Sequence, residues 1–316
     1  MSSHQIVYFV FGIVLLAALL LDLGVLSKKS KVVSIRKALW QTLFWVLLAM
    51  AFFAFLVFEE NNKTALEYLS AYLMEWSLSI DNIFIFILIF TSFKIKEIYY
   101  GRVLLAGILM AIIFRIIFIT VGIELVEHFH WILYLFGAFL IYTGLKMFSE
   151  DEEKEFRLHD NKVYKFLNRF LPISPSDGNG KYIIRVNRKP QYTILFVVVI
   201  ILASVDLIFA LDSIPAVMGI SQDRLVIYTS NIFAVLGLRS LFFLLKGAVN
   251  KFKFLQQGVS IVLIFIGIKM LGEYFINGLL NKNAQVIISL VVIVFCIGGS
   301  ILYSIWHNKT HKKHVH

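Results

Sequence analysis

Two acidic residues lie inside apolar stretches of this chain in the same local pattern. Asp81 lies in EWSLSIDNIFIFILIF (75–90) and Asp206 lies in SVDLIFALDSIPA (204–216), and both stretches fit S-x-D-x-I-F. An ionisable side chain inside a bilayer costs about 2.5–3.5 kcal/mol on insertion scales, so such residues mark places where charge binds or passes. A repeated pair of them predicts an ion-handling site within a membrane.

The apolar stretches contain five carboxylates: Asp22, Glu75, Asp81, Asp206 and Asp212. Two interpretations are open. Each acid could form a structural ion pair with a cation that also lies in an apolar stretch, namely Arg115, Arg239 or Lys269. Alternatively, the acids could bind one cation together. Asp22, near the inner end of the first stretch, could be an entry ligand or a plain interfacial acid.

Helical spacing places polar side chains of the first acidic stretch together. At about 100° per residue, Glu75, Ser79 and Asn82 share one helix face, and Asp81 lies on its flank. The spacing therefore favours a shared site over isolated polar positions.

The second acidic stretch contains a proline that bears on its geometry. Asp206 and Ser213 share a helix face, whereas Asp212 would point about 120° away from Asp206 on a regular helix. We expect Pro215 to break the helix, because proline removes the hydrogen bond to the carbonyl four residues back, here that of Leu211. A carboxylate beside a freed carbonyl suits a hard cation. A plain kink with Asp212 facing water is the alternative.

The chemistry of these side chains limits the ion. We expect six residues to bind it: Asp81, Asp206, Asn82, Asp212, Glu75 and Ser213. Oxygen ligands suit Mg²⁺, Ca²⁺ or Mn²⁺, and the acidic stretches contain no Cys or His for Cu(I) or a dedicated Zn²⁺ site. Four carboxylates repel one another unless a divalent cation or protons neutralise them. Exchange of a metal ion for protons is therefore chemically reasonable.

The composition excludes a soluble domain, with 59% hydrophobic residues, 16% charged residues and a mean hydropathy of +0.82. Nine apolar runs are each about long enough to cross a bilayer: 6–26, 38–58, 68–92, 103–123, 130–148, 191–219, 226–245, 255–276 and 284–306. Lipid offers the backbone no hydrogen bonds, so the runs predict an all-α polytopic membrane protein of about nine transmembrane helices in one domain, residues 1–316.

The basic residues predict the orientation. Alternate connections, together with the C-terminal segment 307–316, hold 24 of the 30 Lys and Arg residues. By the positive-inside rule, the N-terminus lies outside and the C-terminus lies in the cytoplasm. The net charge of +10 is thus a topology signal, and no loop has the basic-aromatic surface of a nucleic-acid binder.

An internal repeat relates two groups of three runs. Asp81 matches Asp206, Arg115 matches Arg239, and LIYTGLKMF (140–148) matches LIFIGIKML (263–271). Consecutive three-helix units cross the membrane in opposite directions. Residues 68–148 and 191–276 therefore predict inverted repeats, an architecture of secondary transporters whose substrate site lies at the repeat interface. We expect the connection 149–190 to be a cytoplasmic loop, with an amphipathic helix over 163–171 and a loop over 172–180.

Several longer motifs resemble the TerC family of membrane proteins, in particular its Alx-like branch of manganese exporters. The motifs are EWSLSIDN (75–82), WILYLFGAFLIYTGLKM (131–147), FALDSIPA (209–216), TSNIFAVLGLR (229–239) and FIGIKM (265–270). The resemblance implies efflux of Mn²⁺ across a bacterial inner membrane, without enzymatic activity or a bound cofactor, and has older links to tellurite resistance. It implies the same six site residues. One departure is Ala203, where family members often carry an acid.

Two other functions are open from the sequence. An intramembrane aspartyl protease also uses two membrane aspartates, but it needs a GxGD-type context that neither SIDN (79–82) nor SVDL (204–207) provides. In a stress-response or assembly scaffold, the acids would be purely structural.

Overall fold

The computed structural model describes residues 3–26, 33–149, 169, 171–174, 176–186, 188–246 and 254–312. For Asp22 and Asp81 only the backbone is described, because their side chains lie outside the described part. The amphipathic helix expected over 163–171 also lies almost entirely outside it.

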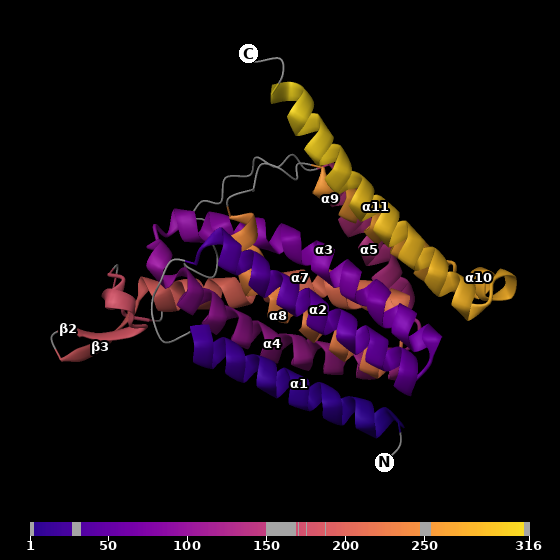
Figure 1. Cartoon of the computed structure of the whole chain (residues 1–316), viewed down its shortest axis with the longest axis horizontal. Coiled ribbons are helices and arrows are strands. Elements are labelled where there is room, and N and C mark those ends of the chain that lie inside the picture. The colour runs from indigo at the N-terminus through magenta and orange to yellow at the C-terminus, as the bar shows by residue number, and fades with distance from the viewer. Residues whose placement is uncertain are drawn as a thin grey trace.

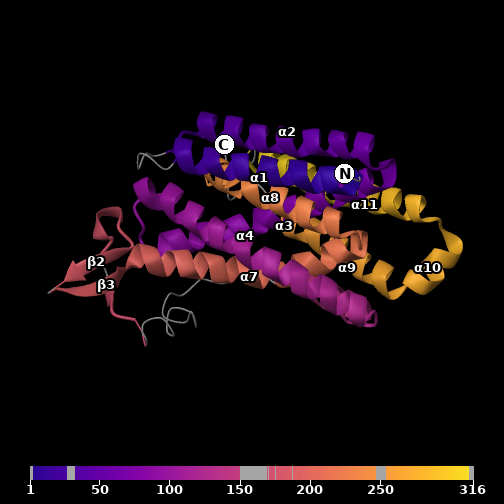
Figure 2. The same cartoon turned by 90° about the horizontal axis from the view of Figure 1, so that it is seen from below.

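Long helices form most of the molecule (Figure 1). They are α1 (Ser3–Leu26), α2 (Ile35–Glu59), α3 (Asn62–Ser92), α4 (Glu97–His128), α5 (Ile132–Ser149), α7 (Ile194–Ile220), α8 (Arg224–Leu245), α9 (Leu255–Leu271) and α11 (Lys282–Lys312). A short helix, α10 (Glu273–Leu279), and a small sheet lie at opposite ends of the bundle in both views (Figure 2).

Within the described ranges, six helices are long and apolar enough to cross a bilayer: α2, α3, α4, α7, α8 and the Asn283–His307 part of α11. Shorter apolar helices cover Gln5–Leu20, Ile132–Phe148 and Leu255–Leu271. Each apolar run of the sequence therefore coincides with an apolar helix, and the prediction of a helical polytopic membrane protein is confirmed at that level. Large exposed apolar side chains, such as Trp40 and Phe295, provide the kind of surface that lipid solvates.

The helix α8 lies at the centre of the bundle, and almost all of its residues are buried. It packs against α2, α3 and α4, while α7 packs against α3 and α4. The figures show α1 and α2 on the opposite side of α8 from α7 (Figure 2). Polar residues on α3, α4, α7 and α8 are therefore enclosed between helices and are shielded from lipid.

The packing of α5 against α9 depends on glycines. A Cβ atom at Gly267 would lie 2.6 Å from the carbonyl oxygen of Gly137 and 2.7 Å from Ile141. A Cβ atom at Gly144 would lie 2.7 Å from Ile264 and 2.8 Å from the carbonyl oxygen of Ser260. Small residues at such positions let two membrane helices approach backbone to backbone.

A three-stranded sheet, in the order β1-β3-β2, precedes α7. β1 (Ile173–Ser174) pairs in parallel with β3 (Lys189–Thr193), which pairs antiparallel with β2 (Ile183–Val186). The sequence predicted no strands here and predicted only a loop over 172–180. The prediction missed the strands because they are short and lack an alternating apolar pattern.

Polar contacts attach this sheet region to the beginning of α4. Lys96 Nζ lies 2.6 Å from Asp177 Oδ2, and the hydrogen bond from Lys96 lowers the pKa of Asp177. The hydroxyl of Tyr182 donates to the carbonyl oxygen of Arg102 at 3.1 Å. The sheet is thus held against the same end of the bundle where α4 starts.

Replacing Gly267 with alanine should lower the melting temperature of the purified protein in detergent, although alanine favours helix. The added methyl group meets backbone oxygen of the facing helix, and overpacking of this kind costs about 1–3 kcal/mol. Gly298→Ala on α11 is the matched control, because nothing lies within 4 Å of its Cβ position. Equal melting temperatures for the two variants would contradict the close α5–α9 packing.

Candidate ion-binding site

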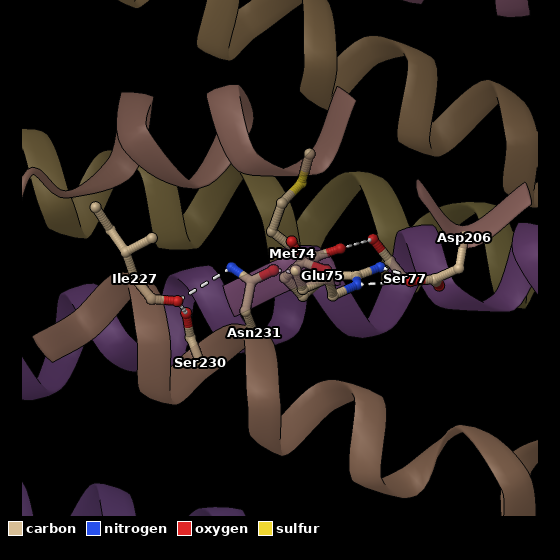
Figure 3. Close-up of polar contacts among 8 residues, drawn as sticks. Met74, Glu75, Ser77, Asp206, Ile227, Ser230 and Asn231 are labelled. Carbon is tan, nitrogen blue, oxygen red and sulfur yellow. Dashed lines mark hydrogen bonds and ion pairs between the residues drawn. The ribbon is translucent and has the colours of Figure 1, made fainter. Parts of the chain in front are cut away.

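Arg115, near the middle of α4, binds two of the predicted acids at once. Its Nε lies 3.0 Å from Asp206 Oδ2 and its Nη2 lies 3.3 Å from Asp206 Oδ1, so that the contact is bidentate. Its Nη1 donates to Glu75 Oε2 at 2.7 Å and to Asn231 Oδ1 at 2.9 Å. Figure 3 shows the side chains of Glu75, Asp206 and Asn231 converging from α3, α7 and α8.

All three charged groups of this cluster are buried. The exposed fraction is 1% for Arg115, 0% for Glu75 and 1% for Asp206. The structural ion pair that the sequence left open is therefore present for Glu75 and Asp206. With every group ionised, two negative charges face one positive charge, so the triad carries a net charge of −1 in a low-dielectric interior.

The local structure explains how the guanidinium is held in place. Its planar fork of five donors matches a carboxylate edge-on, which a lysine ammonium cannot do. Asn231 holds the fork from the other side while its own amide donates to the carbonyl oxygen of Ile227 at 3.1 Å. Asn231, which lies in the TSNIFAVLGLR (229–239) motif, is thus part of the Arg115 cluster.

Three buried side-chain oxygens on α3 and α7 have no hydrogen-bond partner among the described residues. They are Glu75 Oε1, Ser79 Oγ and Ser213 Oγ. Buried polar atoms are normally hydrogen-bonded, so an unbonded carboxylate oxygen beside a net negative charge is costly. These atoms have the chemistry to bind a cation.

Three other predicted ligands, Asn82, Asp81 and Ser213, lie on the helices α3 and α7. Asn82 is buried on α3, and Ser213 is buried on α7 with Asp206. Asp81 lies on α3 one residue before Asn82, but its side chain is outside the described part. Among the described side chains, no three His, Cys, Asp or Glu residues are close enough together to hold a metal ion.

The prediction for Asp212 was wrong in its geometry. The helix α7 continues from Ile194 to Ile220 with Pro215 inside it, so the expected break is not present. The loss of one backbone hydrogen bond at Pro215 therefore did not end the helix. Its Oδ1 accepts a hydrogen bond from Thr143 Oγ1 of α5 at 3.3 Å, away from the buried Asp206.

A polar cavity of about 220 Å³ lies where α3 begins and α7 ends. Among its lining residues are Lys63, Glu67, Ser221, Asp223 and Lys269. Glu67 is buried, accepts a hydrogen bond from Ser221 Oγ at 2.5 Å and pairs with Lys63 at 3.3 Å. The sequence analysis missed Glu67, because it lies one residue before the apolar run that begins at 68.

A smaller cavity, of about 10 Å³, lies beside Asp206. Apolar side chains form the rest of its lining: Phe86, Leu104, Gly107, Ile108, Ala111 and Leu202. This space is close to the volume of one water molecule. The acid cluster is therefore closed to a hydrated ion on this side.

Comparison with known proteins now identifies the family. The family model described as "Integral membrane protein TerC family" matches residues 60–312. The chain belongs to the TerC family. The resemblance expected from the sequence motifs is thereby confirmed, and the matched region contains the whole buried cluster.

Relatives of this TerC protein align over most of its length. An uncharacterized membrane protein of Myxococcus xanthus is 40% identical over 291 residues, which cover 92% of this chain and 89% of the relative. An uncharacterized membrane protein of Rickettsia bellii is 39% identical over 269 residues, covering 85% and 89% of the two chains. Alx of Escherichia coli K12, named as a proposed membrane-bound redox modulator, is 35% identical over 312 residues, covering 96% and 95%. No solved structure gives a significant match.

Replacing Arg115 of this TerC protein with methionine should strongly destabilise it in metal-free buffer. The change leaves two buried carboxylates without a counter-charge, and breaking a buried ion pair from one side costs about 3–5 kcal/mol. Thermal unfolding in detergent with a chelator present measures the loss.

Arg224→Met provides the matched control for that experiment. Arg224 also pairs with two acids, Glu124 and Glu127, but at an exposed surface. Solvent screens such pairs, so this variant should melt close to wild type. If the melting temperature falls equally in both variants, burial does not determine how much the Arg115 cluster contributes to stability.

Proposed function

We propose that this TerC protein is a secondary transporter that exports divalent cations, above all Mn²⁺, from the cytoplasm. The observation that supports this most is the buried cluster of Glu75, Arg115 and Asp206, which combines a net negative charge with an unbonded carboxylate oxygen. Intramembrane ionisable residues that face the protein interior typically mark ion pathways. The protein would use no cofactor and would catalyse no covalent reaction.

The proposed ligands fit a hard divalent ion. Glu75 and Asp206 would supply carboxylate oxygen, and the buried Asn82 and Ser213 would supply neutral oxygen. Asp81 would be the second central carboxylate, by its match to Asp206 in the repeated pattern. Mn²⁺ accepts such oxygen-rich sites, whereas Cu(I) prefers thiolate or thioether ligands. Asp212, on another face of α7, would contribute along the route and not at the centre.

Nine spans with inverted repeats would provide the transport mechanism, and reciprocal contacts support that architecture. The sequence repeat relates α3 to α7, α4 to α8 and α5 to α9. If the two repeats are related in this way, the packing of α3 against α8 in one repeat corresponds to the packing of α7 against α4 in the other. Both contacts are present. Inverted repeats allow alternating access by rocking one half against the other around a central site.

The α5–α9 contact has the same reciprocity at the level of single residues. Gly144 corresponds to Gly267 in the repeat, and Ile141 corresponds to Ile264. Gly267 lies against Ile141, and Gly144 lies against Ile264, so each contact is the repeat image of the other. A self-complementary contact of this kind is what a two-fold relation produces.

The orientation predicted from the basic residues would place the 220 Å³ cavity on the outer side of an inner membrane. Glu67 lies eight residues before Glu75 on α3, about 12 Å at 1.5 Å per residue. The cavity would then be the exit vestibule, and the buried polar residues of α3 between them would follow the route of the ion.

Energetics require a driving force for export. With the cell interior negative, moving one positive charge outward costs about 2.3 kcal/mol per 100 mV, and a divalent ion costs twice as much. Proton antiport would supply this energy, because the proposed acids can bind either protons or metal. This coupling is part of the proposal.

A thiol-based redox function, suggested by the name given to the Alx relative, finds less support in this chain. The sequence contains one cysteine, Cys296, so the chain cannot cycle between a dithiol and an internal disulfide. A scaffold with structural acids remains the contrasting hypothesis, and a transport measurement separates the two.

Asp206→Ala and Asp81→Ala should each abolish Mn²⁺ export. The loss of Asp206 leaves Arg115 paired with Glu75, so the variant keeps a neutral cluster and should still fold. Cells with either variant should accumulate Mn²⁺ and grow poorly in manganese, and ⁵⁴Mn²⁺ flux through proteoliposomes should fall to background. Glu127→Gln, at an exposed helix end, is the control and should transport normally. Normal metal content at normal protein abundance in both aspartate variants would rule out the transporter.

An inwardly directed proton gradient should accelerate Mn²⁺ export several-fold in proteoliposomes at zero membrane potential. Protons arriving from outside would displace the metal from the acids, and a proton on the acid that Arg115 does not neutralise would return with the carrier. The measurement is ⁵⁴Mn²⁺ flux with the pH gradient imposed, absent or collapsed by an ionophore. Equal rates under all three conditions would exclude proton coupling and would leave facilitated export.

A further inference from the structure

We infer that Arg115 is a resident counter-cation of the transport site, which holds Glu75 and Asp206 when metal is absent and must leave them before a divalent cation can bind. This inference rests on the proposed function. It assigns Arg115 a role in each transport cycle beyond its contribution to folding.

The first argument concerns the atoms that the guanidinium covers. Both oxygens of Asp206 accept from Arg115, at 3.0 and 3.3 Å, and one oxygen of Glu75 accepts at 2.7 Å. Three of the four carboxylate oxygens therefore face the arginine. A divalent cation placed between Glu75 and Asp206 would share that space with a positive charge. The two cations would repel each other strongly in a buried site, so they exclude each other.

The second argument concerns protonation. An arginine side chain stays charged in proteins, because its pKa is far above physiological pH. Arg115 therefore cannot make room for the metal by losing its proton. Only movement of the side chain can clear the site, and the long flexible stem of arginine allows such movement. Asn231 Oδ1 accepts from Nη1 independently of the acids, so it offers a neutral partner to the displaced guanidinium.

The third argument concerns the fourth carboxylate oxygen. Glu75 Oε1 is buried and has no hydrogen-bond partner among the described residues. It is the one carboxylate oxygen of the pair that an incoming cation can bind without first displacing the arginine. We therefore place the first contact of the metal at Glu75, followed by the exchange of Arg115 for metal at Asp206.

The benefit of this arrangement lies in the return step. A carrier without bound metal must change conformation while its acids remain inside the membrane. Two uncompensated carboxylates would make that state very costly, whereas the ion pair with Arg115 lowers its cost. The arginine thus competes with the metal for binding and also permits the metal-free carrier to return.

Equilibrium Mn²⁺ binding to the purified full-length protein tests the inference. Arg115→Met should bind Mn²⁺ at least tenfold more tightly than wild type, because no internal cation competes. Saturating Mn²⁺ should raise the melting temperature of this variant more than that of wild type. Arg115→Lys should show a smaller change in the same direction, because an ammonium cannot bind Asp206 in a bidentate manner while also holding Glu75.

Two controls test whether a gain in Mn²⁺ affinity arises at the Arg115 cluster. Arg224→Met removes an arginine that pairs with Glu124 and Glu127 at the surface, and it should leave the Mn²⁺ affinity unchanged. Adding Glu75→Gln and Asp206→Asn to Arg115→Met should cancel the gain, because the carboxylates that Arg115 would otherwise occupy are then absent. If Arg115→Met does not fold, Arg115→Lys decides the question, since it retains the positive charge.

Flux measurements separate the cycle role from a purely structural one. Arg115→Met should lose net Mn²⁺ export from proteoliposomes but should retain exchange of ⁵⁴Mn²⁺ for unlabelled Mn²⁺, because exchange never requires the metal-free return. Unchanged or weaker Mn²⁺ affinity in folded Arg115 variants would overturn the inference. Failure of wild type to move Mn²⁺ would instead overturn the proposed function, so the two failures are distinguishable.

Discussion

The structure depends on the cost of keeping charge away from water. Glu75, Arg115 and Asp206 are each at most 1% exposed, and together they place two carboxyl groups against one guanidinium among apolar helices. A buried ion pair of this kind adds little stability compared with apolar packing, but removing one member is severely destabilising. The cluster is therefore better understood as a constraint on how the helices can be arranged than as a source of stability.

That constraint fixes helix positions that apolar packing leaves undetermined. A helix that carries apolar residues on all its sides, such as α7, can rotate or slide with little change in the apolar area that it buries. The bidentate contact of Arg115 with Asp206 selects one rotation of α7, and the bonds to Glu75 and Asn231 fix α3 and α8 against α4. A single arginine thus sets the register of four helices.

The sequence was a good guide where one physical rule dominates. The apolar runs predicted the helices because a backbone in lipid must satisfy its own hydrogen bonds. The acids that the sequence analysis selected include Glu75 and Asp206, which both contact Arg115. The sequence could not tell which of Arg115, Arg239 and Lys269 would pair with them, since that choice depends on how each helix is rotated about its axis. The expectation for Asp212 was wrong because α7 continues through Pro215, and the polar strands near residue 185 carry no periodic signal.

The spacing of the charged cluster along the chain also bears on its biosynthesis. Glu75 and Arg115 are 40 residues apart on consecutive helices, whereas Asp206 follows Arg115 by 91 residues. During translation, α3 and α4 can therefore enter the membrane with Glu75 and Arg115 already able to pair, well before α7 has been synthesised. Asp206 reaches the membrane last, when Arg115 is already in place. If α7 were synthesised before α4, Asp206 would enter the membrane before its counter-charge Arg115.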